Sequence, residues 1–305
     1  MTGIWIDSAH TDDLRRARLY RGDLYITSAS RAGRALIEHA RAMIEEAFAP
    51  HDPETAQYHM AVKDYAALLG RLKPAFIHHP RCKELLREIL AEHGADLEKT
   101  YFDVPKLRSS TSDGYLTTGI AQAFPPHRDT WYSAPHAQIN YWTPVYDITA
   151  DNGMNFWPGY IAKPVANNSD TYNYYQWNKL RENTVALIGD ANTRIAPGTT
   201  EPLPEGDVRF VTKCGGFTLF AAAQLHGSLA NTSGRTRFSI DFRVVNVDDL
   251  VAGLGAPNVD AKCTGTALRD FMRATDHARL PEDLVKRYDS GEVGDGVLVY
   301  KPPAG

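Results

Sequence analysis

The stretch Phe124-Pro125-Pro126-His127-Arg128-Asp129-Thr130-Trp131 decides how the rest of this sequence is interpreted. It holds a histidine and an aspartate two positions apart, His127 and Asp129. On an extended strand, residues i and i+2 point to the same side, so an imidazole and a carboxylate can meet at one point. A His-x-Asp pair is a weak signal by itself, because His127 could equally bond a neighbour in a loop. The pattern becomes specific only when a third ligand joins it.

A second histidine follows far downstream, in Gln224-Leu225-His226-Gly227-Ser228. Two histidines and one carboxylate occupy one face of an octahedron around a metal ion. That donor set suits non-haem iron(II) and leaves the other positions open for a bidentate cosubstrate and oxygen. His127, Asp129 and His226 are therefore the candidate metal ligands and catalytic residues.

Residues 236–245 alternate between apolar and polar side chains, which predicts a strand. Its polar face carries Arg237, Ser239, Asp241 and Arg243. One interpretation is a half-buried strand with a solvated polar face. The other is a barrel interior, where Arg237 would bind a carboxylate through two parallel charge-assisted hydrogen bonds, helped by the hydroxyl of Ser239.

In combination, His127-x-Asp129, His226 and Arg237-x-Ser239 resemble the iron(II)/2-oxoglutarate dioxygenases, and most of all the phytanoyl-CoA dioxygenase-like group. The resemblance implies that the two histidines and the aspartate hold Fe(II). It implies that Arg237, with Ser239, binds the distal carboxylate of the cosubstrate 2-oxoglutarate. O2 would be the third reactant.

The resemblance covers roughly residues 100–246 and has one departure. The group often shows Pro-Gly-Ser-x-x-His between the two metal motifs, whereas this sequence has Trp157-Pro158-Gly159-Tyr160-Ile161-Ala162. This difference leaves the substrate class open but does not touch the iron ligands. Related halogenases replace the carboxylate ligand with a small residue, so Asp129 implies hydroxylation, or a related desaturation or ring closure, and not chlorination.

The composition narrows the function classes. The chain of 305 residues is 43% hydrophobic and 23% charged, as expected for a globular protein with a sizeable core. A net charge of −4 gives no broad footprint for nucleic acid or an acidic membrane. Three widely spaced cysteines favour free thiols in a reducing compartment. With no secretory pattern and no bilayer-length apolar run, we expect a cytoplasmic protein that binds a small molecule, with no nucleic-acid or membrane partner.

Three helices are predicted in the N-terminal third, after one or two short strands. The first is capped by Ser30. The second begins at Asp52-Pro53-Glu54 and runs toward Leu72, with proline at its first position. The third covers about residues 80–93. We expect all three to pack on the outside of a sheet.

Short strands are predicted around the metal motif, over residues 101–110, 115–123 and 137–145. In the last of these, Gln138 and Asn140 share one face and are candidate cosubstrate contacts, although ordinary barrel packing explains them equally well. An aromatic-rich loop, residues 165–178, is either a lid or an anchor to the barrel. The candidate substrate contacts are Arg108, Trp131, Trp142 and Tyr174. For Arg108, a solvated sheet edge is the alternative.

The expected fold class is mainly β with packed helices: a double-stranded β-helix, or jelly-roll (cupin-like) core, with the N-terminal helices outside. We expect residues 1–305 to form a single domain. Residues 1–99 would be the helical support, 100–246 the jelly-roll core with an insertion at about 150–210, and 247–305 a C-terminal helical tail. Helices are expected near residues 266–275 and after Pro281.

The predicted function is hydroxylation of an unactivated C–H bond in a small polar metabolite or natural-product intermediate, with release of succinate and CO2. Three alternatives stay open at the level of sequence. One is a cupin-type metalloenzyme that does not use 2-oxoglutarate. Another is a non-catalytic jelly-roll binding protein. The last is a coincidental match in which His127 and His226 lie far apart.

Overall fold

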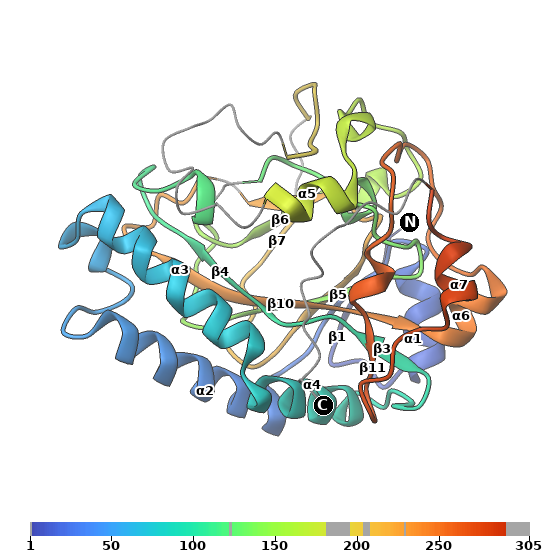
Figure 1. The fold of residues 1–305 in the computed structure, drawn as a ribbon, viewed down its shortest axis with the longest axis horizontal. Coiled ribbons are helices and arrows are strands. Elements are labelled where there is room, and N and C mark those ends of the chain that lie inside the picture. The colour runs from blue at the N-terminus through green and yellow to red at the C-terminus, as the bar shows by residue number, and fades with distance from the viewer. Residues whose placement is uncertain (1, 122–123, 181–195, 204–207, 229, 291–305) are drawn as a thin grey trace.

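An eight-stranded mixed sheet forms the centre of the computed structural model (Figure 1). The structure describes residues 2–121, 124–180, 196–203, 208–228 and 230–290. The strand order of the large sheet is β1-β2-β8-β5-β10-β3-β11, with β4 also pairing with β10. The strands of this sheet are β1 (Ile4–Ile6), β2 (Leu24–Ile26), β3 (Thr100–Phe102), β4 (Lys106–Ser110), β5 (Ile139–Pro144), β8 (Thr218–Ala221), β10 (Arg237–Asn246) and β11 (Met272–Arg273).

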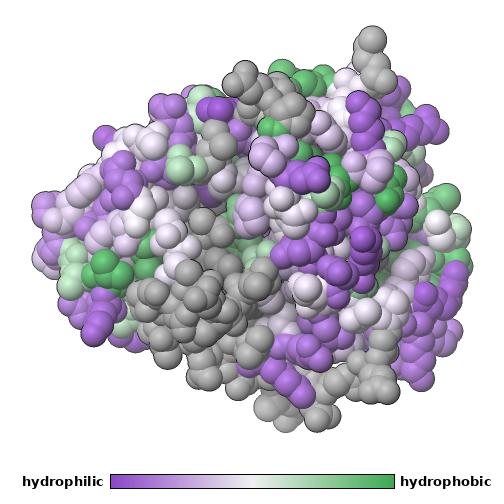
Figure 2. Space-filling model, turned by 90° about the horizontal axis from the view of Figure 1, so that it is seen from above, coloured by the Kyte–Doolittle hydropathy of each residue, from purple (hydrophilic) through white to green (hydrophobic). Residues whose placement is uncertain are grey.

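A small antiparallel sheet supplies the second layer. Its order is β7-β6-β9, formed by β6 (Met154–Phe156), β7 (Val208–Phe210) and β9 (His226–Ser228). It lies on one side of the large sheet, together with α5 (Tyr174–Leu180), as Figure 1 shows. Seen from this side, much of the described surface is hydrophilic (Figure 2). Two sheets around a shared interior, with helices outside, confirm the predicted jelly-roll core.

Helices α2 (Arg31–Phe48), α3 (Val62–His78) and α4 (Pro80–Glu92) cover the opposite face of the large sheet (Figure 1). Strand β10 explains the arrangement. Its apolar residues Phe238, Ile240 and Phe242 are completely buried. The ring of Phe238 contacts Phe48 of α2 at 5.6 Å between centroids. The polar side chains of β10 therefore point to the interior between the two sheets, as predicted.

The predicted start of α2 and the predicted start and end of α4 are confirmed. The hydroxyl of Ser30 accepts a hydrogen bond from the backbone N–H of Gly33, 3.0 Å away, and caps α2. Proline 80 occupies the first position of α4, which ends one residue before His93. The second helix was predicted to begin at Asp52, but α3 begins at Val62. The intervening residues form turns and a short 3-10 helix, because the side chain of Asp52 accepts from the backbone N–H of Glu54 and closes a local turn.

Two further predictions are wrong. The predicted strand over residues 115–123 is a turn followed by a 3-10 helix, Gly119–Ala121, where residues 122–123 lie outside the described part. The helix expected near residues 266–275 is a 3-10 turn, Ala267–Asp270, that runs directly into β11. Pairing of β11 with β3 draws this segment into the sheet. Tertiary pairing therefore overrides the local helical preference.

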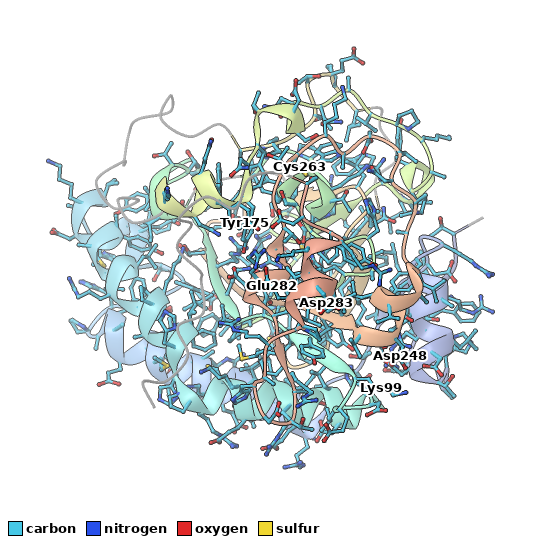
Figure 3. The ribbon with its side chains drawn as sticks, turned by 45° about the vertical axis from the view of Figure 1, so that its right-hand side comes forward. Lys99, Tyr175, Asp248, Cys263, Glu282 and Asp283 are labelled. Carbon is cyan, nitrogen blue, oxygen red and sulfur yellow. The ribbon has the colours of Figure 1, made fainter. Side chains whose placement is uncertain are left out.

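The C-terminal segment packs against the sheet edge and α5 (Figure 3). It contains α6 (Val247–Ala252) and α7 (Glu282–Lys286), which begins directly after Pro281 as expected. Asp248 of α6 forms an ion pair with Lys99 at 2.8 Å. Tyr175 of α5 donates a hydrogen bond to Asp289 over 2.6 Å. Within the described residues, no helix is long and apolar enough to cross a bilayer.

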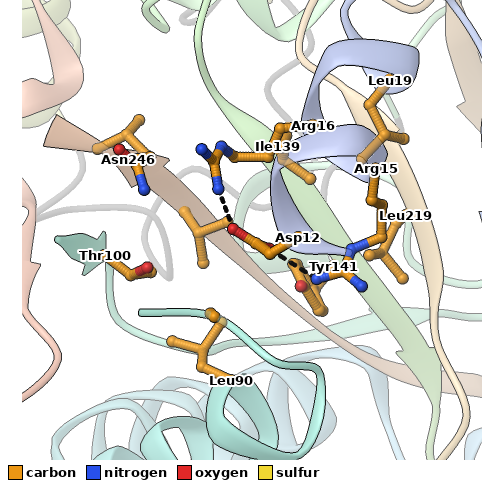
Figure 4. A pocket seen from close by; sticks show the side chains of 13 residues that line it. Asp12, Arg15, Arg16, Leu19, Leu90, Thr100, Ile139, Tyr141, Leu219 and Asn246 are labelled. Atoms are coloured by element: carbon orange, nitrogen blue, oxygen red, sulfur yellow. Dashed lines mark hydrogen bonds and ion pairs between the residues drawn. The ribbon is translucent and has the colours of Figure 1, made fainter. Parts of the chain in front are cut away.

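A small cavity lies on the helix-covered side of the large sheet, next to α1 (Asp12–Leu19) (Figure 4). Ile139 and Tyr141 of β5 line it, with Asp12 forming ion pairs to Arg15 and Arg16. The side chains of β5 alternate, so Asn140 points to the other side of the sheet. This cavity is therefore separate from the interior between the two sheets.

Candidate iron and cosubstrate site

His127 and His226 meet through a short antiparallel bridge between the metal motif and β9. The backbone N–H of each residue donates to the carbonyl oxygen of the other, at 2.8 and 2.9 Å. The two imidazole rings lie 4.4 Å apart between centroids. Gly227 allows this approach, since a Cβ there would lie 3.1 Å from the Cα of Pro126. A coincidental match with distant histidines is thus excluded.

Asp129 lies on the same side of the chain as His127, as the two-residue spacing predicted, because Arg128 between them is extended (φ −112°, ψ 142°). It opens a 3-10 helix, Asp129–Tyr132, and does not continue a strand from His127. Its Oδ1 nevertheless lies 3.5 Å from the Nε2 of His127 and 3.8 Å from the Nε2 of His226. One ligand atom from each of these residues lies within 4.8 Å of the others. The structure therefore brings the three predicted ligands together, and the extended stretch ends at Asp129, where the 3-10 helix begins.

Hydrogen bonds orient both imidazoles. Nδ1 of His127 lies 2.8 Å from the carbonyl oxygen of Pro125, and Nδ1 of His226 lies 2.8 Å from that of Gln224. A carbonyl oxygen can only accept, so the proton of each neutral ring sits on Nδ1. The lone pair on each Nε2 then faces Asp129. This is the arrangement in which second contacts fix the tautomer of metal-binding histidines.

The charges at the triad suit a cation. Burial, with the neighbouring His127, lowers the pKa of His226 to about 4, so this ring is neutral near pH 7. Burial acts to raise the pKa of Asp129, but the imidazoles of His127 and His226 beside the carboxylate lower it when they are protonated, and the pKa lies below its ordinary value. A neutral imidazole and an ionised carboxylate are the forms that bind metal. The donor set therefore fits iron(II) without loss of a proton from His226.

Gln138 and Asn140 lie beside the carboxylate ligand and are both buried. The Nε2 of Gln138 donates to Asp129 Oδ2 over 3.2 Å and to Asn140 Oδ1 over 2.8 Å. Both amides thus face the interior between the two sheets. This is the side on which they could contact the cosubstrate. Their direct neighbour in this structure is the candidate metal ligand Asp129.

Arg237 is buried in the same interior with incomplete hydrogen bonding. Its Nη1 donates to the carbonyl oxygens of Asn152 and Gly153, at 2.8 and 3.1 Å, and its Nη2 donates to Ser228 Oγ at 3.1 Å. Its Nε, like Ser239 Oγ two residues along β10, is buried without a hydrogen-bond partner in the described structure. Burial lowers the pKa of Arg237 to about 10, which leaves it charged at neutral pH. A buried cation with unused donors fits one carboxylate of 2-oxoglutarate.

Ser228 is a site residue for which the sequence predicted no role. It lies on β9 two residues after His226 and contacts Arg237 across the two sheets. The signal was present in the spacing His226-x-Ser228, which repeats the two-residue period of His127-x-Asp129. That spacing alone could not reveal the contact, because Ser228 and Arg237 lie on strands of different sheets.

The four predicted substrate contacts separate into two groups. Arg108 lies on the interior face of β4, ion-paired with Asp241 at 2.7 Å, and its side chain is 37% exposed. Its guanidinium lies 5.8 Å from the ring of Phe124. Trp142 lies 5.7 Å from the guanidinium carbon of Arg237. These two residues belong to the site.

Trp131 and Tyr174 are engaged elsewhere. Trp131 is fully buried, and its indole N–H donates to Asp260 over 2.7 Å. Tyr174 is buried and donates to Asp270 of the C-terminal segment. Neither side chain has the exposed surface that a substrate contact requires, so both have structural roles. Sequence patterns identify aromatic residues but do not show which of their faces is already covered.

Other aromatic rings connect the triad to the insertion. The ring of Tyr132 lies 5.2 Å from that of His127 and 5.2 Å from that of Tyr172. Trp177 of α5 contacts Tyr132 at 6.2 Å and Tyr172 at 5.3 Å. The aromatic loop predicted over residues 165–178 thus reaches the ring that packs on a metal ligand. Residues 181–195 of the insertion, and 204–207, lie outside the described part.

The jelly-roll core, the His-Asp-His triad and the buried arginine are together those of the iron(II)/2-oxoglutarate oxygenase class. A family model described as "Phytanoyl-CoA dioxygenase (PhyH)" matches residues 28–239. The match covers more than half of the sequence, and the chain therefore belongs to the phytanoyl-CoA dioxygenase family. None of the curated proteins matches the sequence.

Similar solved structures include three with low sequence identity. EvdO2 from Micromonospora carbonacea var. aurantiaca is 16% identical, with a TM-score of 0.36 over 57% of this chain and 62% of its own. The epimerase SnoN, in complex with Fe3+, alpha ketoglutarate and nogalamycin RO, is 17% identical, with a TM-score of 0.40 over 82% of this chain and 96% of its own. AviO1 from Streptomyces viridochromogenes Tue57 is 15% identical, with a TM-score of 0.38 over 78% and 97%. This chain thus spans less than two thirds of EvdO2, and family membership rests on the match to the family model.

Proposed function

We propose that this protein is an iron(II)- and 2-oxoglutarate-dependent dioxygenase that hydroxylates an unactivated C–H bond of a small polar metabolite or natural-product intermediate. The observation that carries the proposal is the pairing of two features in one interior. One is the triad His127, Asp129 and His226. The other is the buried Arg237, whose Nε has no partner in the described structure.

Each residue has a role in this proposal. The triad holds the iron, while Arg237 and Ser239, with Ser228, bind the distal carboxylate of 2-oxoglutarate. When bound, iron and 2-oxoglutarate convert O2 to an oxidant for C–H bonds and release succinate and CO2. The protein neutralises the cosubstrate, holds the ligands in place and excludes water.

The substrate is proposed to lie near Arg108 and Trp142. Arg108 is partly exposed and keeps its charge through Asp241, so it can meet a polar or anionic group. Trp142 is 4% exposed and its indole lies beside the cosubstrate arginine, so it would shape the interior next to 2-oxoglutarate. The aromatic rings of Tyr132 and Trp177 lie between the triad and the insertion, which supports a lid role for that loop. A single-domain cytoplasmic protein with no nucleic-acid or membrane partner completes the proposal.

The test is anaerobic addition of iron(II) and 2-oxoglutarate, followed by visible spectroscopy for the metal-to-ligand charge-transfer band. We expect a band in the wild type that is lost in His127→Ala and weakened in Arg237→Ala. Arg235→Ala is the matched control, because Arg235 is an exposed neighbour that pairs with Glu54 and does not face the interior. Iron binding by the wild type without a band would instead favour the cupin-type enzyme or the binding protein.

A further inference from the structure

The two oxygens of Asp129 have different neighbours. Oδ1 faces the Nε2 atoms of His127 and His226. Oδ2 accepts from Gln138 Nε2 at 3.2 Å and lies 3.9 Å from the Nε of Arg243. The first oxygen is thus directed to the ligand cluster, and the second is directed to two donors, Gln138 directly before β5 and Arg243 on β10.

Contacts with two other carboxylates, those of Asp103 and Asp241, fix the guanidinium of Arg243 near Asp129. Its Nη1 donates to Asp103 Oδ2 at 2.9 Å, and its backbone N–H donates to Asp103 Oδ1 at 2.7 Å. Its Nη2 forms an ion pair with Asp241 at 3.3 Å. These contacts occupy both terminal nitrogens of the guanidinium. The Nε of the guanidinium is the nitrogen nearest to Asp129.

Two acceptors fix the side-chain amide of Gln138. Its Nε2 has two hydrogens, and its partners are Asp129 Oδ2 and Asn140 Oδ1. Asn140 is paired with Arg243 in the register of β5 against β10. The guanidinium thus approaches the carboxylate oxygen from β10, and the amide approaches it from the residue that precedes β5. The backbone carbonyl of Gln138 accepts from Ala222 at 2.9 Å, which fixes that residue beside the sheet.

We propose that Gln138 and Arg243 are positioning residues that hold Asp129 Oδ2 and present Oδ1 alone to the iron. This inference rests on the proposed function, because it gives these residues a role toward the same metal. A carboxylate bound through one oxygen occupies one coordination position and leaves its neighbours for the cosubstrate and O2. Second contacts of this kind are a general means of orienting ligands at metal sites.

The first test measures iron(II) affinity anaerobically by calorimetry in Gln138→Leu and Arg243→Lys. Leucine removes the donor to Oδ2, and a lysine ammonium cannot serve three carboxylates in the fixed geometry of a guanidinium. We expect each variant to bind iron(II) roughly 10- to 100-fold more weakly than the wild type. In Gln138→Leu the charge-transfer band with 2-oxoglutarate should also move to longer wavelength, because Asp129 without its donor gives more electron density to the iron.

Lys106→Met is the matched control. Lys106 forms an ion pair with Asp103 at 2.8 Å, as Arg243 does, but the structure shows no contact between Lys106 and Asp129. Its loss disturbs the same charged network, and iron affinity and band position should stay at the wild-type values. Equal weakening in Lys106→Met would assign the effect to the network as a whole and overturn the positioning role.

The wild type supplies a measurement that does not depend on how the variants fold. Infrared difference spectra of the metal-free and iron-bound protein, with 13C-labelled aspartate, report the carboxylate stretches of the ligand. A wide separation of the two stretches, typical of binding through one oxygen, is expected, and a narrow one would contradict the proposal. If the wild type binds no iron(II), the proposed function itself fails. If it binds iron(II) while Gln138→Leu and Arg243→Lys keep its affinity and band, only the positioning role fails.

Discussion

The guanidinium of Arg237 shows how one buried residue prepares a site for a ligand. Burying a charge is costly unless it is paired, and here two backbone carbonyls and Ser228 supply acceptors without a formal counter-charge. The unused Nε and the hydroxyl of Ser239 lie on the same face of β10. A carboxylate that joins them would neutralise the cation and satisfy both groups. Binding energy can thus come from completing interactions that the protein leaves unfinished.

Replacing Ser239 by alanine tests this directly. We expect Ser239→Ala to lower the affinity for 2-oxoglutarate roughly 2- to 10-fold, the range for one hydrogen bond, while iron(II) affinity stays unchanged. Ser109→Ala is the control, since the hydroxyl of Ser109 is also buried without a partner in the described structure but points to the opposite side of the sheet. Cosubstrate titrations of the two iron-loaded variants give the comparison. An equal loss of 2-oxoglutarate affinity in both variants would show that Ser239 does not bind the cosubstrate.

A second residue-scale prediction concerns acid sensitivity. Burial, and the nearby Arg15, lower the pKa of His93 to about 4, and its ring stacks on Tyr141 at 5.6 Å. Below pH 6.5 the unfolded chain binds a proton at this histidine, while the folded protein does not until about pH 4. Stability should therefore fall as the pH drops through this window, and His93→Gln should reduce the slope by up to about 1.4 kcal/mol per pH unit. Denaturant unfolding at several pH values measures it, and an unchanged slope would contradict the assignment.

Strand β10 organises the molecule at the level of elements. It pairs with β3, β4 and β5 of the core, contacts α2 of the N-terminal part through Phe238, and runs directly into α6 of the C-terminal segment. Its apolar face anchors α2, and its polar face carries Arg237, Ser239 and Arg243. A second junction lies where the first turn of α2 meets the turn before β8. There the backbone carbonyl of Gly215 would lie 2.1 Å from a Cβ at Gly33, too close for any side chain.

Gly33→Ala is therefore expected to destabilise the protein even though alanine favours helices. The helical preference is worth up to about 1 kcal/mol. The clash with a backbone atom requires α2 and the turn to separate, so we expect a net loss of roughly 1–2 kcal/mol. Gly159→Ala is the control, because nothing lies within 4 Å of a Cβ at that position. Comparable stability of the two variants in chemical denaturation would disprove the close contact.

At the scale of the whole molecule, Asp260 ties distant segments to the metal motif. It accepts hydrogen bonds from Arg128 at 3.2 Å, from Trp131 at 2.7 Å and from the backbone of Val165 at 3.0 Å. Arg128 is 1% exposed and also donates to the carbonyl oxygens of Tyr160 and Lys163. The residue between His127 and Asp129 thus holds the insertion and the C-terminal segment against the site.

Removing the carboxylate of Asp260 should strongly lower the free energy of unfolding. Asp260→Ala leaves the buried guanidinium of Arg128 without its counter-charge, and breaking such a pair typically costs about 3–5 kcal/mol. Asp283→Asn, at an exposed position of α7, should change stability by less than about 0.5 kcal/mol. Denaturant unfolding compares the two variants. A loss below about 1 kcal/mol in Asp260→Ala would show that the backbone carbonyls around Arg128 suffice.

The amino-acid sequence by itself determined the elements whose signals are local. The alternation of residues 236–245 predicted β10 and its polar face, because side chains alternate along any strand. Ser30 and Pro80 predicted the starts of α2 and α4, since capping acts within one turn. The ligand residues were predicted for a related reason, because only a few residue types provide the donor atoms that iron(II) prefers.

The tertiary structure alone decided how these residues meet. A bridge to β9 brings His226 beside His127, and a 3-10 helix turns the chain after Asp129; the His-x-Asp spacing predicted neither of these. Contacts across 96 and 129 positions bind Tyr174 to Asp270 and Trp131 to Asp260, and long-range packing also brings Arg243 to Asp129. Ser228 and Arg237 are only nine positions apart, but they meet because their strands belong to different sheets. Periodicity specifies the face of an element on which a side chain lies. The partner on the opposite face depends on how distant segments pack, which no local pattern encodes.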